Sequence, residues 1–272
     1  MVSGGKPTSA PVNNPAPAPW TVPLVVGTPS GGSGSGSSGL LTSAQLLDLF
    51  VPSPSTRAGE AGSSKTGIQH TIKISSAWTP KLSNLRADNT PAQFYPVNID
   101  PTLAPISDSS QVAWAAKHYI VAPVNMILES QARSRNVQIN CQSIVDTENK
   151  SKRSLSMFWT FQAAGTASTP FAAIQFDGYQ SVVESQWTST QLLTISPGRG
   201  MCARLLWKAN SYNIRYLVEF DWNTMVLLVL GNTDDRTQSR DASARYTKNI
   251  QTMKWYLFEF LTEALREKMA GK

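Results

Sequence analysis

The sequence has few of the residues that most catalytic and metal-binding sites use. Its 272 residues include only two histidines and two cysteines, Cys141 and Cys202. It contains no Gly-x-Ser-x-Gly elbow, no Walker loop, no dinucleotide fingerprint and no Cys-x-x-Cys pair for zinc. We therefore expect no enzymatic activity, no metal and no cofactor. An enzyme whose catalytic groups converge only in space remains the alternative.

Charge and long apolar runs are also scarce. Charged residues make up 15% of the chain, against about 25% in an ordinary domain. The net charge of +6 is a mild basic excess, compatible with a nucleic acid or an anionic membrane as partner. No stretch reaches the ~18 uninterrupted apolar residues of a membrane span, and no secretory signal is visible. The sequence therefore predicts a reduced, soluble, intracellular protein.

Residues 1–66 lack the composition of a packed core. They are rich in Pro, Gly and Ser, with a Gly/Ser tract at 27–39 and a Ser/Gly/Pro tract at 52–67. Such a segment buries too little apolar surface to offset the entropy lost on ordering. We expect a disordered N-terminal arm over residues 1–66.

A short apolar stretch at residues 40–50 interrupts this arm. Thr42 and Gln45 have the spacing of a capping box, which predicts a helix start. An isolated helix of this length is marginal in water, so it needs a partner surface. That surface is either the chain's own domain or a neighbouring subunit. The candidate contact residues for self-assembly are Leu46, Leu47, Leu49 and Phe50.

From Ile68 onward, apolar and polar residues alternate with the period of β-strands. The alternating sets are Ile68 to Ile74, Val137 to Cys141, Leu155 to Phe161, Ala172 to Phe176, Met201 to Trp207 and Ile214 to Trp222, followed by the apolar run Met225 to Leu230. In the Ile214 set, Arg215, Glu219 and Asp221 fall on the opposite face. The pattern predicts a mainly β fold, an antiparallel sandwich of about eight strands and jelly-roll-like topology, over residues 67–233.

Two regions have helical spacing instead. Residues 109–134 read as a helical insertion that Pro123 splits. Residues 234–272 read as a linker followed by a C-terminal amphipathic helix. Trp255 and Phe258 widen the apolar stripe of that helix beyond what one packing surface needs. We therefore expect these two aromatic residues to meet a second subunit.

The basic residues form two groups. Arg133 and Arg135 end the helical insertion, and Lys150, Lys152 and Arg153 lie in a predicted hairpin. These five are the candidate nucleic-acid-binding residues, through phosphate contacts; a solvated hairpin tip is the alternative. A second group mixes cations with rings, as single-stranded nucleic acid requires: Arg204, Trp207, Lys208, Tyr212 and Arg215. Packing of Trp207 in the core is the alternative for that group.

This organisation resembles the coat proteins of non-enveloped RNA viruses that fold as jelly-roll sandwiches. The resemblance is architectural and covers Ile68 to Leu230 loosely. It implies a homo-oligomeric capsid subunit that encloses nucleic acid, RNA in this class, located in the virion and in the host cell cytoplasm. The nearly neutral arm departs from the Arg-rich arm common there, which puts arm-mediated packaging in doubt. The alternative is a viral matrix or movement protein that binds membrane or RNA without forming a shell.

Overall fold

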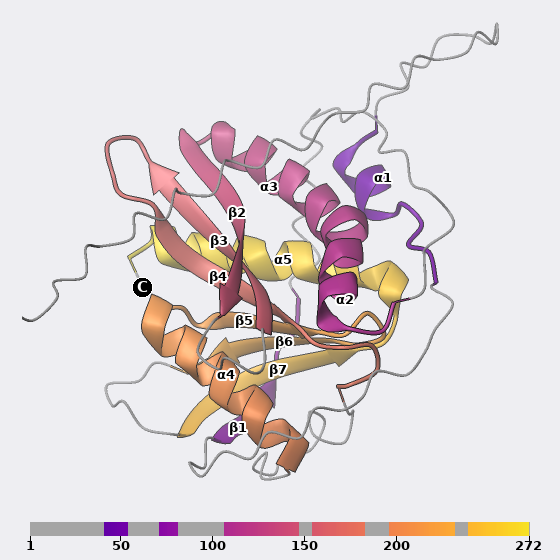
Figure 1. Cartoon of the computed structure of the whole chain (residues 1–272). Coiled ribbons are helices and arrows are strands. Elements are labelled where there is room, and N and C mark those ends of the chain that lie inside the picture. The colour runs from indigo at the N-terminus through magenta and orange to yellow at the C-terminus, as the bar shows by residue number, and fades with distance from the viewer. Residues whose placement is uncertain are drawn as a thin grey trace, which may run out of the picture.

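The computed structural model describes residues 41–53, 71–80, 106–146, 154–182, 196–231 and 239–271. Seven strands form one mixed sheet in the order β1-β7-β6-β5-β4-β3-β2 (Figure 1). Their bounds are β1 Thr71–Ala77, β2 Val137–Asp146, β3 Ser154–Ala163, β4 Thr169–Phe176, β5 Tyr216–Phe220, β6 Met225–Leu230 and β7 Ser239–Thr247. The β1–β7 and β4–β5 pairs are parallel and the other pairs are antiparallel.

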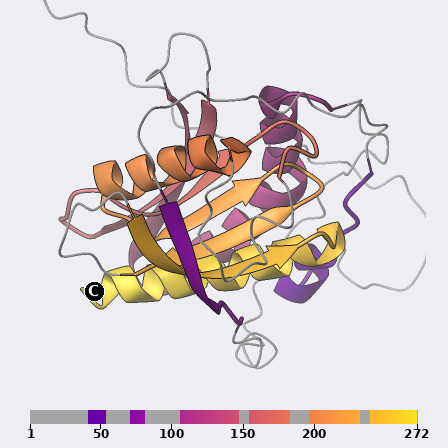
Figure 2. The same ribbon diagram turned by 90° about the horizontal axis from the view of Figure 1, so that it is seen from below.

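Helices cover both faces of this sheet. They are α1 Ser43–Leu47, α2 Ser109–Ala116, the π-helix η2 Lys117–Val121, α3 Ala122–Arg133, α4 Ser196–Tyr212 and α5 Ile250–Met269. Figure 2 shows α4 along one face and α5 along the other. The α2, η2, α3 and α1 residues share a buried cluster with α5. Because the described strands form a single sheet between helical layers, the expected two-sheet sandwich is not confirmed.

The strand predicted from Met201 to Trp207 is wrong, because these residues belong to α4. Alternate residues in this stretch are apolar, which suggested a strand. Residues spaced three and four apart are apolar as well, which fits one face of a helix. The residues of α4 that the structure buries include Met201, Cys202, Leu205, Leu206 and Ala209, which is a repeat of one helical face. The α4 helix joins the parallel strands β4 and β5, as a crossover connection requires.

The helical insertion at 109–134 is confirmed, with a different arrangement at Pro123. Asp108 caps α2 by accepting hydrogen bonds from the backbone of Ser110 and Gln111. The chain then passes through the π-helical turn η2 before Pro123, which lies in the first turn of α3. Because the first-turn N–H groups of a helix lack intrahelical partners, proline is tolerated there. The chain continues around Pro123 without a break.

The C-terminal helix is also confirmed, as α5, and Asn249 caps it through a 3.2 Å bond from the Gln251 backbone. The expected linker before it is not one, because Ser239–Thr247 forms β7 between β1 and β6. The segment Ser239–Thr247 alternates polar and small residues, so its sequence carries no apolar strand signal. Backbone pairing with β6 on one side and with β1 on the other holds this segment in the sheet.

Candidate functional site

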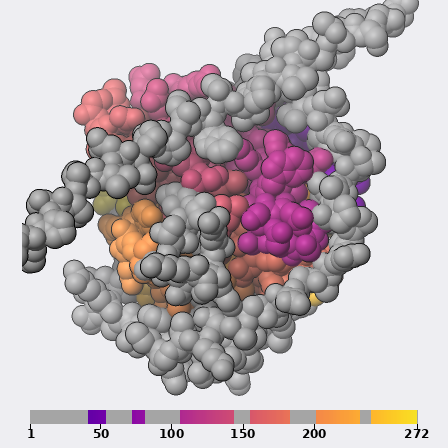
Figure 3. All heavy atoms as spheres, viewed as in Figure 1, coloured from indigo at the N-terminus to yellow at the C-terminus, as the bar shows by residue number. Residues whose placement is uncertain are grey.

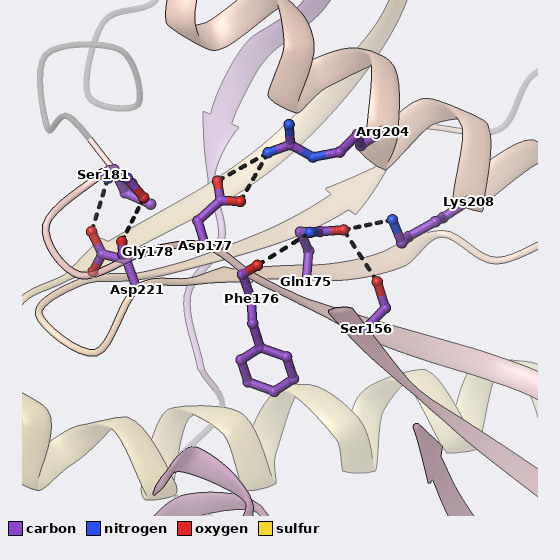
Figure 4. Close-up of polar contacts among 10 residues, drawn as sticks. Ser156, Gln175, Phe176, Asp177, Gly178, Ser181, Arg204, Lys208 and Asp221 are labelled. Atoms are coloured by element: carbon purple, nitrogen blue, oxygen red, sulfur yellow. Dashed lines mark hydrogen bonds and ion pairs between the residues drawn. The ribbon is translucent and has the colours of Figure 1, made fainter. Parts of the chain in front are cut away.

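The α4 face of the sheet buries a group of polar side chains. The pairing of β3, β4 and β5 places Ser156 beside Gln175 and Gln175 beside Glu219. Two cations one helical turn apart on α4 point at these strands (Figure 4). We call the whole set the polar cluster: Ser156, Gln175, Asp177, Arg204, Lys208, Glu219 and Asp221. Five of its members, all except Asp177 and Arg204, are at most 1% exposed.

Hydrogen bonds in the polar cluster tie α4 to β4 and its end, and tie β4 to β3. Nη2 of Arg204 lies 3.0 Å from each carboxylate oxygen of Asp177, at the end of β4. Nζ of Lys208 donates to Oε1 of Gln175 at 2.5 Å, and Oγ of Ser156 donates to the same oxygen at 3.1 Å. The α4 helix is therefore held on the sheet by directional polar contacts as well as by apolar packing.

Glu219 is the most unusual ionisable group of the cluster. Burial raises the pKa of its carboxyl well above the ordinary value, and the charge of Asp177 and a hydrogen bond with it raise it further. Arg204 and Lys208 act in the opposite direction, with smaller effect. Because burial dominates, Glu219 keeps its proton at pH values where an exposed glutamate is ionised.

Asp221 organises the turn after β5. Its Oδ2 accepts from the Val182 backbone at 2.8 Å, while its Oδ1 accepts from the backbones of Asn223 and Thr224 at 3.0 and 2.6 Å. This turn holds Trp222 at φ 73°, a left-handed conformation that is costly for a bulky residue. Burial raises the pKa of Asp221 to about 7, although the three backbone bonds lower it. Asp221 therefore joins the segments that follow β4 and β5.

The polar cluster has the composition of a reactive site but the arrangement of a structural link. Perturbed carboxyls at the carboxyl ends of parallel strands are typical of functional sites. Here the charges are directed at one another, and most members are closed off from solvent. In the described part of the chain, no group of three His, Cys, Asp or Glu residues could hold a metal. The arrangement suits a pH-sensitive connection between α4 and the sheet.

An open hollow of about 450 Å³ lies at the start of β2. We call it the β2 hollow; its lining residues are Arg133, Asn136, Val137, Gln138, Gln162, Ala163, Ala164 and Gly165. The turns that shape it use left-handed backbone at Asn136 (φ 56°) and Gly165 (φ 76°). The lining offers one guanidinium and three carboxamides and contains no carboxylate. This chemistry fits phosphate and sugar oxygens.

Two of the five predicted nucleic-acid-binding cations, Arg133 and Arg135, lie in the described part of the chain. Arg133 is 79% exposed, with Glu129 3.6 Å away, and Arg135 is exposed in the following turn. Lys150, Lys152 and Arg153 lie outside the described residues, and their phosphate contacts stay a prediction.

The second basic group is used inside the subunit. Arg204 and Lys208 belong to the polar cluster. Arg215 donates from Nε to the Leu230 carbonyl at 2.7 Å and forms an ion pair with Glu267 at 3.2 Å. Trp207 is half-buried and contacts Tyr212 edge to face, with ring centroids 6.1 Å apart. These contacts favour the core alternative for Trp207 over a stacking platform for nucleic acid.

Residues 41–53 form an ordered stretch, which we call the docked segment. The capping box between Thr42 and Gln45 is present, and Leu46 and Leu47 are fully buried. The side chain of Gln251 on α5 accepts from the Val51 backbone at 3.2 Å and donates to it at 3.0 Å. The docked segment therefore packs on its own subunit, the first of the two predicted alternatives.

Two further residues of α5 fasten the docked segment. Nε1 of Trp255 donates to Asp48 at 2.6 Å, and the buried ammonium of Lys254 donates to the Leu49 carbonyl. Burial lowers the pKa of Lys254 to about 8. Phe50, which follows, is 57% exposed. Among the candidate self-assembly residues near 40–50, Phe50 is thus the one most available to a partner.

The expectation that Phe258 meets a second subunit is corrected by the structure. Phe258 is fully buried in the core, and Trp255 is half-buried beside the docked segment. The apolar stripe of α5 is wide because the helix packs on the sheet with one side and on the docked segment with another. A partner surface supplied by the chain's own N-terminal region explains the pattern that suggested a second subunit.

The polar cluster is the feature that sequence reasoning missed. The signal available was Arg204 and Lys208 at a spacing of four residues, which places them on one face of a helix. That signal was hidden by the strand interpretation of the same stretch. The alternation of their strand places Glu219 and Asp221 on the face opposite the apolar set. The sequence does not show that α4 covers that face.

Comparison with known proteins gives no match to a family model, a curated protein or a solved structure. Among the helices of the described residues, none is long and apolar enough to cross a membrane.

Proposed function

We propose that this chain is a self-assembling structural subunit of the coat type, and that it contacts nucleic acid, RNA in the first instance, through the β2 hollow. The observation that carries the nucleic-acid part is the chemistry of that hollow. Arg133 supplies a fork of donors for phosphate oxygens. Asn136, Gln138 and Gln162 supply amide donors and acceptors for sugar and base edges. No carboxylate in the lining opposes a polyanion.

The coat part of the proposal rests on composition and on the arm. Few charges, no recognisable catalytic motif and a long, nearly neutral N-terminal region are typical of subunits whose surfaces meet other copies. The docked segment shows where that region is anchored, on α5 and on α3. The jelly-roll topology is not part of the proposal, because one sheet between helices can serve an assembling subunit equally well.

The test removes the charge of Arg133 in the β2 hollow and of Arg135 beside it. Arg133→Ala with Arg135→Ala should weaken binding of a single-stranded RNA oligonucleotide of mixed sequence, measured by fluorescence anisotropy. Two lost phosphate contacts should reduce the log–log salt slope by about 1.4 units. The control is Lys73→Ala with Arg266→Ala, which removes the same charge from exposed positions elsewhere. Equal slopes for the two double variants, or no RNA binding by the wild type, would contradict the proposal.

Assembly is tested on the same preparations. Size-exclusion chromatography and negative-stain electron microscopy of the wild type, with and without RNA, should show regular particles or rings larger than a dimer. A chain that stays monomeric at all concentrations, with and without RNA, would refute the coat part of the proposal.

The matrix or movement alternative has one structural observation in its favour. In the part of the chain that the structure describes, the large exposed apolar residues outside the C-terminal end of α5 are Trp114 on α2 and Phe50, at 58% and 57% exposure. Figure 3 shows α2 at the surface of the subunit. Exposed aromatic residues are typical of interfaces with membranes or proteins. Flotation with anionic liposomes that is lost in Trp114→Ser and Phe50→Ser would favour this alternative over the coat.

A further inference from the structure

The two edge strands of the sheet differ in how they are protected. An unprotected edge presents free backbone groups that pair with other strands, and proteins guard such edges with bulges, charges or prolines. Strand β1 is short, carries a register shift between Ile74 and Ser76 and exposes Lys73. Strand β2 pairs with β3 over ten residues without a shift. From Val137 to Val145 the sequence contains no charge and no proline.

Strand β2 is firmly anchored, so its open edge is regular. On one side of the strand, Val137 and Ile139 are buried, at 4% and 6% exposure, in the same core cluster as α3. On the other side, Gln138, Asn140 and Gln142 are exposed in a row. Among the strands that the structure describes, none pairs with the outer edge of β2. The strand thus presents a long template with an unbroken register, uncharged from Val137 to Val145.

We propose that the outer edge of β2 pairs antiparallel with β2 of a second copy of this chain, about a two-fold axis perpendicular to the sheet. Seven strands from each copy then form one continuous sheet, and each helical layer stays on its own face. This inference rests on the proposed self-assembly and names its first contact. It goes beyond that proposal by assigning the interface.

A second copy fits this edge because the exposed row is self-complementary. Glutamine and asparagine carboxamides both donate and accept hydrogen bonds. A row of them can therefore pair with an identical row in the antiparallel direction. Since Val137 to Val145 is uncharged, no like charges oppose each other along the junction. An acidic or a basic peptide would find no opposite charge there, so the edge favours its own copy.

The symmetry also predicts which side chains meet. Directly opposed residues of an antiparallel pair point to the same face, so a perpendicular two-fold axis must pass between one residue and its own copy. For a junction centred on β2, that residue is Asn140, Cys141 or Gln142. The exposed positions then pair in a fixed way: residue 140 with itself, residue 142 with itself, or residue 140 with residue 142.

Cysteine cross-linking tests this arrangement. Gln138→Cys, Asn140→Cys and Gln142→Cys are made singly, oxidised alone and in pairwise mixtures, and examined by non-reducing electrophoresis. We expect the pattern of one register: residue 140 with itself together with residue 138 with residue 142, or residue 140 with residue 142, or residue 142 with itself. The remaining combinations should be at least about tenfold less cross-linked. These variants carry Cys141→Ser, because Cys141 is only half-buried and meets its own copy in one of the three registers. Burial raises the pKa of the other native thiol, Cys202, to about 12. Lys73→Cys on the β1 edge is the matched control and should not cross-link.

Charge repulsion tests the same junction without a covalent cross-link. Asn140→Lys with Gln142→Lys opposes ammonium groups across the two-fold axis and should raise the dimer dissociation constant at least about tenfold, measured by sedimentation velocity. The control, Ala77→Lys with Thr79→Lys, adds the same charge at exposed positions on and just after β1 and should leave dimerisation unchanged. Circular dichroism and melting curves verify that both double variants are folded.

The outcomes separate this inference from the proposed function. One outcome would overturn the β2 junction alone: the wild type forms particles, the β2 variants also assemble, and no cysteine pair cross-links. A cross-linked dimer that grows no further and binds no RNA would keep the junction and overturn the coat proposal. A wild type that stays monomeric refutes both. Hydrogen exchange that shows both edges of β2 protected in a monomer would assign the edge to another segment of the same chain.

Discussion

The two faces of the sheet are built from the same strands and bury different chemistry. On the face covered by α5, α2, α3 and α1, the buried cluster consists of large apolar side chains such as Trp159, Phe171 and Phe260. On the face covered by α4, the apolar cluster is smaller and surrounds Gln175, Lys208 and Glu219, which are buried to the same degree. Among the described elements, α4 is the helix that covers the second face, and it brings its own cations.

Strand β5 shows how one segment serves both faces. Tyr216, Val218 and Phe220 lie in the apolar cluster, whereas Leu217 packs under α4 and Glu219 belongs to the polar cluster. The apolar face gains stability in proportion to the area removed from water. The polar face gains specificity, because buried ionisable groups are tolerated only in one hydrogen-bonded arrangement. We therefore expect the first face to carry most of the stability and the second to carry the response to pH.

The largest effect should come from the apolar face. Phe258→Ala removes a fully buried ring of α5 and should lower the free energy of unfolding by about 3–5 kcal/mol, measured by urea denaturation. The control is Phe50→Ala, since Phe50 is 57% exposed and should cost less than about 0.5 kcal/mol. Similar costs for the two variants would show that α5 does not pack as described.

The next effect should be the pH response of the polar face. An unfolded glutamate titrates near ~4.3, whereas the folded pKa of Glu219 is raised. The folded state therefore binds more protons above that pH, so stability falls as pH rises through the raised pKa. Glu219→Gln mimics the protonated acid and should remove this part of the loss. Between pH 5 and pH 8, wild type should therefore lose more stability than the variant, as measured by urea denaturation.

Asp221 supplies the control for this pH response. Its pKa of about 7 has the same sign, so wild type and Glu219→Gln should both retain the fall that Asp221 contributes as pH rises toward 7. Urea denaturation at pH 5, 6, 7 and 8 separates the two groups. Identical pH profiles for wild type and Glu219→Gln would show that Glu219 is ionised in the folded protein, against its described environment.

What the sequence predicts well follows from local rules. The capping box at Thr42 and Gln45, the helical spacing of α5 and the alternation in β5 each need only neighbouring residues to be recognised. The failures come from information that lies far away in the chain. Whether Glu219 faces water depends on α4, and whether Trp255 faces a partner depends on residues 41–53. Period two alone also fails for Met201 to Trp207, where seven residues are too few to separate a strand from a helix.

The site was predicted less well than the fold for the same reason. Arg133 and Arg135 were recognised as exposed cations, and the structure places Arg133 in the lining of the β2 hollow. The carboxamides that complete the hollow come from β2, from the residue before it and from β3. They meet only because β2 and β3 pair in a particular register, which the sequence alone does not reveal. A buried charge cluster is still harder to predict, because its members read individually as surface residues.

The docked segment should respond more weakly, because it adds a small patch to the apolar face. Gln251→Ala removes both hydrogen bonds to the Val51 backbone and should destabilise docking by about 1–2 kcal/mol. Hydrogen exchange at Leu46 and Leu47 should then accelerate about fivefold to thirtyfold, with exchange in β5 unchanged. Arg266→Ala, exposed near the other end of α5, is the control. Faster exchange throughout the sheet would mean that the segment is part of the global core.

The smallest effect should come from Ser156 on β3, and its neighbour Met157, which faces the opposite side of the sheet, is the comparison. Ser156→Ala, on the polar face, removes one of the donors to Oε1 of Gln175, and Lys208 still donates to that oxygen at 2.5 Å. The cost should be about 1 kcal/mol. Met157→Ala, one residue along and in the apolar cluster, should cost about 2–5 kcal/mol. Both changes are measured by urea denaturation at pH 6. If Ser156→Ala costs as much as Met157→Ala, the polar cluster contributes to stability as strongly as the apolar core, and the contrast between the two faces is one of chemistry alone.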